Sequence, residues 1–123
     1  MTNRLSTKLD PYIESASDSG LSGKASAVYV ALLEAGTAIS PKGIIARTVL
    51  HRQYVYDALH ELQERGLIHS AGEGKLVKYT AVSPDKMVKD IEIERLRMLD
   101  SVQNLMKLYN RSPSGIVEIV SGS

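Results

Sequence analysis

Apolar residues recur every three or four positions along three parts of the chain, at about 21–36, 50–66 and 83–109. This spacing is typical of helices that bury one face. A serine lies at the start of the first and third parts, and Gly36 and Gly66 end the first two. The pattern therefore predicts three helices of several turns each.

Two shorter helices are predicted where a capping side chain precedes a proline, because proline fits the first position of a helix. Asp10-Pro11 starts a helix that runs through Ala16, and Ser40-Pro41 starts a second, brief one. The brief helix is joined by a turn to the longer helix after it. Two helices joined in this way are typical of a helix-turn-helix.

Two short β-prone segments follow, at 67–69 and 77–80, with a glycine-rich tip at 72–74 between them. They predict a hairpin. A hairpin directly after a helix-turn-helix is the wing of a winged helix, here residues 67–81. The predicted fold class is mainly α with a small β-hairpin wing: a winged helix-turn-helix followed by a long C-terminal helix.

The last helix carries a heptad seam, with Arg95 as its charged member. A helix this long cannot be buried on a small winged domain alone, so we expect the seam to pair with a second copy of the chain. The alternative is that the helix packs back on its own domain. The residues expected at the dimer contact are Val88, Ile91, Met98, Leu99, Val102, Leu105, Met106 and Tyr109.

These patterns divide the chain into a polar arm at 1–8, a winged helix-turn-helix domain at 9–82, a coiled-coil-like dimerisation helix at 83–110 and a tail at 111–123. The tail contains a strand-like segment at 115–120. The sequence shows no partner strand for it.

Composition narrows the classes of function. The 123 residues include no cysteine, which excludes a disulfide scaffold, a thiolate zinc site and a cysteine nucleophile. The first twenty residues are polar and do not form a secretory signal, so we expect a cytoplasmic protein without a membrane segment. His60 and Glu64 supply too few ligands for a metal, and the sequence has no catalytic constellation. We expect no metal, no cofactor and no enzymatic activity.

A family resemblance rests on three segments: LSGKASAVYVALLEAG (21–36), LHRQYVYDALHELQERGLI (50–68) and YTAVSPDKMVKDIE (79–92). Together they resemble the winged-helix domain of the TrmB family of transcriptional regulators. The resemblance covers about 9–110 and implies a homodimer that binds promoter DNA and is paired by the long helix. The segment LYNRSPSGIVEIVSG (108–122) resembles the junction where longer members enter an effector domain that senses sugars or other ligands. We expect either the DNA-binding part of such a protein or a stand-alone module, and the sequence identifies no effector ligand.

The sequence departs from the family pattern at several positions. An acidic residue usual in the second helix is absent at Ala25-Ser26, and the loop at 36–42 has one extra residue. Val49 replaces the glycine of the helix-turn-helix, and His51 stands where serine or threonine usually caps the recognition helix. These changes bear on the turn and on the target sequence, not on the fold.

A net charge of only +1 conceals an uneven distribution of charge. No acidic residue lies between Gly36 and Tyr56, and the wing has none between Glu73 and Asp85. Basic residues lie in both stretches. The chain can therefore present a basic face to DNA, and its lysines suit phosphate groups.

The recognition helix, at 51–65, is expected to enter the major groove of DNA with its leading end, where arginine can pair with guanine and glutamine with adenine. Its acids, Asp57, Glu61 and Glu64, follow that end and are expected away from DNA. Arg47 can contact DNA or pair with a carboxylate. The residues expected to bind DNA are His51, Arg52, Gln53, Tyr54, Tyr56, Lys42, Lys75 and Lys78.

The leading hypothesis is a sequence-specific, homodimeric transcriptional regulator of double-stranded DNA, associated with the nucleoid. One alternative is an architectural protein that coats DNA with little preference, although the low net charge is unfavourable for it. Another is a protein-interaction module whose segment 115–120 pairs with a partner's sheet edge. Such a module would not need Arg52-Gln53-Tyr54 beside a basic wing.

Overall fold

The computed structural model describes residues 3–111, and at 3–7 it describes the helical backbone alone. The tail segment at 115–120 lies outside the described residues. The chain divides into two compact units, which we call the winged unit (1–86) and the C-terminal unit (87–123).

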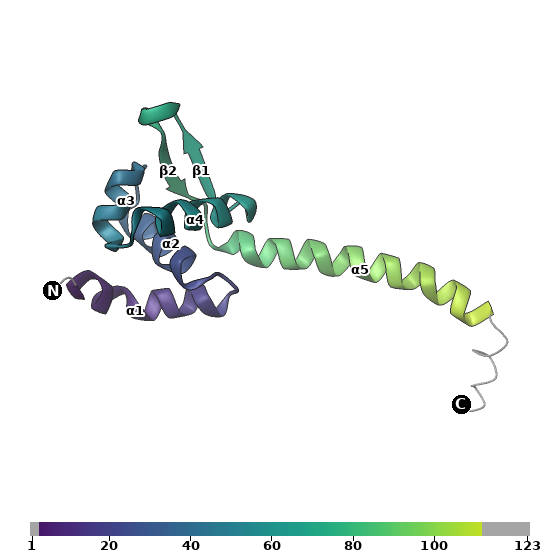
Figure 1. Cartoon of the computed structure of the whole chain (residues 1–123). Helices are drawn as coiled ribbons and strands as arrows, with labels where there is room; N and C mark the ends of the chain where they lie inside the picture. Colours follow the sequence, from purple (N-terminus) through teal and green to yellow (C-terminus); the bar gives the residue numbers. More distant parts are fainter. Residues whose placement is uncertain (1–2, 112–123) are drawn as a thin grey trace. The chain divides into compact units, whose positions relative to one another are not determined.

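The described elements follow the order predicted for a winged helix-turn-helix with a long C-terminal helix (Figure 1). They are α1 (Asn3–Asp18), α2 (Gly23–Ala35), α3 (Pro41–Thr48), α4 (Arg52–Glu64), β1 (Ile68–Ala71), the 3-10 helix η1 (Gly74–Leu76), β2 (Lys78–Ala81) and α5 (Asp85–Arg111). The predicted fold class is confirmed.

Short polar side chains set the helix starts as the sequence predicts. The Ser22 hydroxyl accepts a hydrogen bond from the Ala25 amide at 3.2 Å, and the Ser40 hydroxyl accepts one from the Gly43 amide at 3.1 Å. Each bond satisfies an amide that has no partner inside the helix. Gly36 then ends α2 in a left-handed conformation with φ of 67°.

Helix α1 differs from the sequence expectation. It begins at Asn3 instead of Asp10, so Pro11 lies inside the helix and residues 3–8 of the expected polar arm are helical. Proline removes one backbone hydrogen bond at this point. Leu9 is 7% exposed, and burial of this side chain favours the helix on the N-terminal side of the proline.

The core of the winged unit is built on α2, which is buried on all sides from Val28 to Leu32, and on one face of α4. Val28, Tyr29 and Leu32 are buried on α2, and Val55 and Leu62 are buried on α4. These residues carry the helical spacing seen in the sequence. Packing of α4 against α2 fixes the recognition helix on the rest of the unit.

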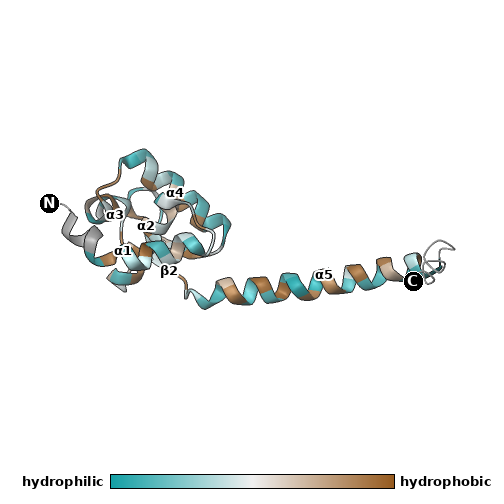
Figure 2. Ribbon diagram, turned by 90° about the horizontal axis from the view of Figure 1, so that it is seen from below, coloured by the Kyte–Doolittle hydropathy of each residue, from teal (hydrophilic) through white to brown (hydrophobic). Residues whose placement is uncertain are grey.

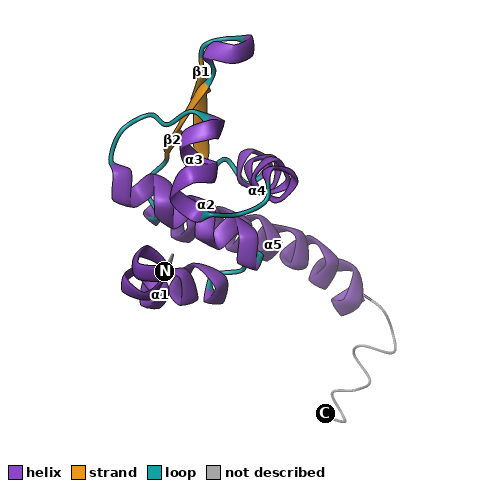
Figure 3. Ribbon diagram, turned by 60° about the vertical axis from the view of Figure 1, so that its left-hand side comes forward, coloured by secondary structure: helices purple, strands orange, loops and turns teal. Residues whose placement is uncertain are grey.

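The wing is an antiparallel hairpin of β1 and β2, in which Ile68 pairs with Ala81 and Ala71 with Lys78. Figure 3 shows the two strands extending away from the helices of the winged unit. An isolated bridge that the sequence did not reveal joins Ile39 to Tyr79, with N–H···O distances of 2.9 and 2.8 Å. The bridge ties the wing to the residue just before the N-cap of α3.

The turn between α3 and α4 contains a left-handed residue that is not glycine. Val49 has a φ of 59°, and its amide donates to the Ile45 carbonyl at 2.8 Å. The Thr48 hydroxyl accepts from the Leu50 amide at 3.3 Å and closes the next step of the turn. The family's glycine is therefore not required for this geometry.

Helix α5 matches the predicted long helix, but none of its residues is buried. Figure 2 shows hydrophobic and hydrophilic residues alternating along it. The expected dimer residues are all exposed, and Ile93, Leu96 and Leu108 outside the seam are exposed as well. The charged seam member, Arg95, pairs with Glu92 at 2.7 Å. No helix within residues 3–111 is long and apolar enough to cross a membrane.

Candidate nucleic-acid interface

A groove of about 490 Å³ lies where α3, α4 and the wing meet. We call it the cationic groove. Its lining is Ser40, Pro41, Lys42, Ile45, Arg52, Tyr56, Gly74, Lys75 and Val77. Three of these residues are basic and none is acidic. The groove therefore joins four residues that the sequence assigned to DNA contact, from three separate elements.

Backbone pairing holds the walls of the groove together. Lys42 lies in the first turn of α3, directly after the capped start at Ser40. The bridge between Ile39 and Tyr79 fastens this start to β2. Lys75 lies in η1, between the two strands. The lysine of α3 and the lysine of the wing thus reach one groove although they are distant in the sequence.

Arg52 is held on the ring of Tyr56. The Arg52 guanidinium carbon lies 5.5 Å from the Tyr56 ring centroid, one helical turn away on α4. A cation over an aromatic face is attracted by the ring's quadrupole. The stacking limits the freedom of Arg52 and directs its charge into the groove.

A second cluster lies on the exposed face of α4 and includes a residue of α2. We call Lys24, Gln53 and Asp57 the Asp57 cluster. The Gln53 amide nitrogen donates to one Asp57 oxygen at 3.0 Å, and the Lys24 ammonium pairs with the other at 3.3 Å. The same ammonium lies 5.3 Å from the Tyr54 ring centroid. Asp57 is thus in direct contact with one expected DNA-binding residue, unlike the sequence expectation.

The Asp57 cluster favours an ionised carboxylate. The hydrogen bonds from Gln53 and then Lys24 lower the pKa of Asp57 below its ordinary value. At neutral pH the side chain is therefore a permanent acceptor, with Lys24 as its counter-charge.

Glu61 has a structural role that sequence reasoning missed. Its carboxylate accepts the Ser22 amide at 2.9 Å and the Ser22 hydroxyl at 2.6 Å. The same hydroxyl caps α2. Glu61 therefore fastens the recognition helix to the start of α2, and it is part of the scaffold of the site.

The remaining predicted residues lie around the groove but do not line it. His51 is the N-cap of α4 without a side-chain capping bond, and its ring lies 6.0 Å from that of Tyr54. Lys78 is exposed on β2. Arg47 pairs with Glu34 at 3.3 Å, which confirms the alternative that it pairs with a carboxylate.

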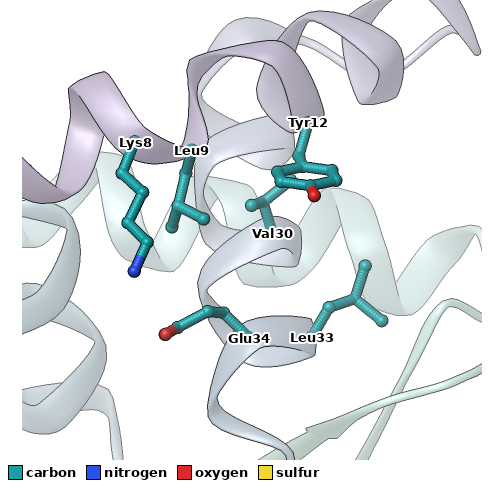
Figure 4. Close-up of a pocket in the computed structure, with 6 residues that line it drawn as sticks. All are labelled: Lys8, Leu9, Tyr12, Val30, Leu33 and Glu34. Atoms are coloured by element: carbon teal, nitrogen blue, oxygen red, sulfur yellow. The ribbon is translucent and has the colours of Figure 1, made fainter.

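A separate, mainly apolar pocket of about 470 Å³ lies between α1 and α2 (Figure 4). It is lined by Lys8, Leu9, Tyr12, Val30, Leu33 and Glu34. This pocket is not predictable from local sequence patterns, because its walls come from two helices. As for metals, His60 lies 3.7 Å from Glu64, and no group of three or more possible ligands occurs among residues 3–111.

Comparison with known proteins identifies a family for this chain. The family model described as "Sugar-specific transcriptional regulator TrmB" matches residues 17–85. No curated protein sequence matches the chain. The match includes α2, α3, α4 and the whole wing, so it contains both the cationic groove and the Asp57 cluster.

Two solved structures share the fold at low sequence identity. TrmBL2, described as an archaeal chromatin protein with a novel mode of DNA binding, aligns with a TM-score of 0.68 and 20% identity over 90% of this chain. The chain spans 44% of the length of TrmBL2. A MarR family transcription regulator aligns with a TM-score of 0.51 and 15% identity, over 95% of this chain and 83% of that one.

The family match covers more than half of the chain, and the fold is that of DNA-binding transcription regulators. The chain therefore belongs to the TrmB family of transcriptional regulators.

Proposed function

We propose that this protein is a sequence-specific regulator that binds double-stranded DNA as a homodimer and acts at the nucleoid. Helix α4 enters the major groove, and the wing at 67–81 contacts the backbone. The observation that carries the proposal is the cationic groove, which is lined by basic residues of α3, α4 and the wing and by no acidic residue.

The groove suits a phosphate group. Among the described residues, no carboxylate forms an ion pair with Lys42, Arg52 or Lys75. The sequence predicts that Arg52 can pair with guanine, but its place in one groove with Lys42 and Lys75 favours a phosphate. Contacts of this kind fix the register of a protein on DNA. Base reading then falls to Gln53 and Tyr54, which are exposed on the first turn of α4.

Substitution of groove residues tests this assignment. We expect Lys75→Ala and Arg52→Ala to weaken binding to all DNA sequences alike and to lower the slope of log affinity against log salt by about one each. Titrations of a fluorescent duplex at several salt concentrations measure this slope. Lys107→Ala on α5 is the matched control and should leave it unchanged. If Arg52→Ala instead reduces binding to a preferred sequence alone, Arg52 reads a base.

The homodimer rests on the exposed seam of α5. The apolar residues of the seam recur at heptad spacing, yet none is buried in one chain. A second copy presents the same seam, so a symmetric pair would bury both. Glu92 neutralises Arg95, which is the charged member of the seam. Such a pair would place two recognition helices on half-sites one helical turn of DNA apart, or a multiple of it.

A charge placed in the seam should separate the subunits. We expect Leu99→Glu or Val102→Glu to give monomers and to weaken DNA binding, because a dimer would bury two unpaired carboxylates. Light scattering measures the mass of the particle. Asn104→Glu, on the opposite face of α5, is the matched control and should stay dimeric. A dimer that survives both seam substitutions would overturn this assignment.

An architectural role is the second candidate, because TrmBL2 is described as a chromatin protein. The two roles separate when the protein is incubated with fragments of its own genome at physiological ionic strength and the retained DNA is sequenced. We expect a shared motif of two related half-sites. Even coverage of the genome would support the architectural role, and no retention would contradict DNA binding altogether.

A further inference from the structure

Gln53 and Asp57 lie one turn apart on the solvent face of α4, while the buried residues of the helix occupy the other side. Both oxygens of Asp57 are engaged. One accepts from the Gln53 amide at 3.0 Å and the other from Lys24 at 3.3 Å. Asp57 thus connects an expected base-reading residue to a cation of α2.

The chemistry of this contact fixes the orientation of the Gln53 amide. An ionised carboxylate can only accept hydrogen bonds, so it must face the NH₂ group of glutamine and not its carbonyl oxygen. The carbonyl oxygen and the second N–H of Gln53 then point away from Asp57. The side chain consequently offers one acceptor and one donor in a fixed order.

This pair of groups matches one base edge. In the major groove adenine presents the N7 acceptor and the N6 amino donor, and glutamine pairs with both through its N–H and its carbonyl oxygen. A free glutamine must select the correct amide orientation when it binds. A glutamine already held by Asp57 loses less conformational entropy on binding. More of the favourable interaction free energy therefore contributes to the affinity for adenine.

We propose that Asp57 is a positioning residue that fixes the amide of Gln53 for the recognition of adenine in the major groove. The inference rests on the proposed function, because it requires α4 to lie on DNA. Lys24 completes the Asp57 cluster, because its ammonium offsets the charge of Asp57, which would otherwise repel the phosphates of the DNA.

The test selects bound duplexes from a random-sequence DNA library with the full chain and counts the bases at each position of the motif. Gln53→Ala identifies the position that Gln53 reads. Asp57→Asn should then reduce the preference for adenine at that same position about ten-fold. The asparagine can both donate and accept, so it no longer fixes the orientation of Gln53. Asp57→Glu keeps an acceptor and should restore part of the preference.

The matched control is Glu64→Gln, which removes the same charge from the same helix without a contact to Gln53. We expect it to leave every base preference unchanged. In the double variant Gln53→Ala/Asp57→Asn, the preference should equal that of Gln53→Ala alone, because Asp57 acts through Gln53. Thermal melting by circular dichroism verifies that each variant is folded.

Three results would overturn the inference. If Asp57→Asn weakens binding to all sequences equally, Asp57 has a structural role. If Gln53→Ala changes a base preference and Asp57→Asn does not, Gln53 reads its base without help, while the proposed function stands. If the unmodified protein selects no motif, sequence-specific recognition fails, and the role of Asp57 fails with it.

Discussion

The winged unit and residues 87–111 of α5 differ in the burial of their apolar side chains. In the winged unit, Tyr29, Leu32 and Leu62 are at most 2% exposed. Along α5, Leu105 is 65% exposed and Val88 68% exposed. Both regions have helices with apolar residues at regular spacing, so the periodicity alone does not decide burial.

The difference shows which part of the chain can fold without a partner. Burial of apolar surface stabilises the winged unit within one chain. Residues 87–111 have no such stabilisation, and ion pairs between Glu92 and Arg95 and between Glu94 and Arg97 support this helix only weakly. The winged unit therefore has a core of its own, whereas the apolar side chains of residues 87–111 stay exposed within one chain, as the proposed dimer requires.

The largest expected effect tests this contrast directly. Leu62→Ala should lower the free energy of unfolding by about 2–5 kcal/mol, because it opens a cavity in a fully buried site. Leu108→Ala, outside the proposed dimer seam, removes the same atoms from an exposed position and should leave the winged unit as stable as before. Urea denaturation followed by tyrosine fluorescence measures both. Equal losses in the two variants would contradict the division of the chain into a core and an unburied helix.

A smaller effect is expected at the end of the winged unit. The buried Tyr29 hydroxyl of α2 donates to the Val82 carbonyl at 2.7 Å, just before α5 begins at Asp85. Tyr29→Phe leaves that carbonyl without this donor and should cost about 1 kcal/mol. The loss would show that the residues up to α5 are part of the cooperative winged unit. If the midpoint of urea denaturation does not change, the cooperative winged unit ends before Val82.

The same tyrosine predicts that the stability of the protein depends on pH in the alkaline range. Burial, and then the charge of Asp85, raise the pKa of Tyr29 above its ordinary value. A raised pKa means that the folded state holds the proton more tightly than the unfolded state. This stabilisation is complete below the unfolded pKa, near 10, and is lost as pH rises through the folded pKa. Tyr29→Phe should therefore reduce the fall in stability above pH of about 10.

Local signals in the sequence predicted most of the fold. Ser22, Ser40 and Gly36 mark helix ends because capping depends on residues within one turn. The start of α1 was not predictable in this way, because burial of Leu9 outweighs the local signal of Pro11. A helix boundary that depends on tertiary packing leaves no local mark.

The candidate site was predicted less completely, for the same physical reason. The leading end of α4 and the wing lysines follow from residue type and from the absence of nearby acids. The contacts of Asp57 with Lys24 and of Glu61 with Ser22 join residues more than thirty positions apart. Charge along the sequence cannot show which acid reaches which base. The structure therefore assigns different roles to two acids that look alike in the sequence.

The smallest expected effect separates backbone strain from packing inside the winged unit. Val49 is 66% exposed and has a φ of 59°, so its side chain contributes little burial while its branched carbon disfavours this conformation. Val49→Gly removes about 1–2 kcal/mol of strain. It adds about 0.5–1 kcal/mol of backbone entropy cost. The expected net gain in the free energy of unfolding is therefore about 0–1.5 kcal/mol.

Gly36→Ala is the matched control for this prediction. Gly36 has a φ of 67°, and an added Cβ would meet no atom within 4 Å, so the substitution tests the backbone alone. It should lower the free energy of unfolding by about 1 kcal/mol. Shifts of the urea midpoint in opposite directions in the two variants would show that glycine suits both left-handed positions. If Val49→Gly instead destabilises the protein, the exposed valine contributes more through its contacts than its backbone strain costs, and the turn is packed more like the core than like α5.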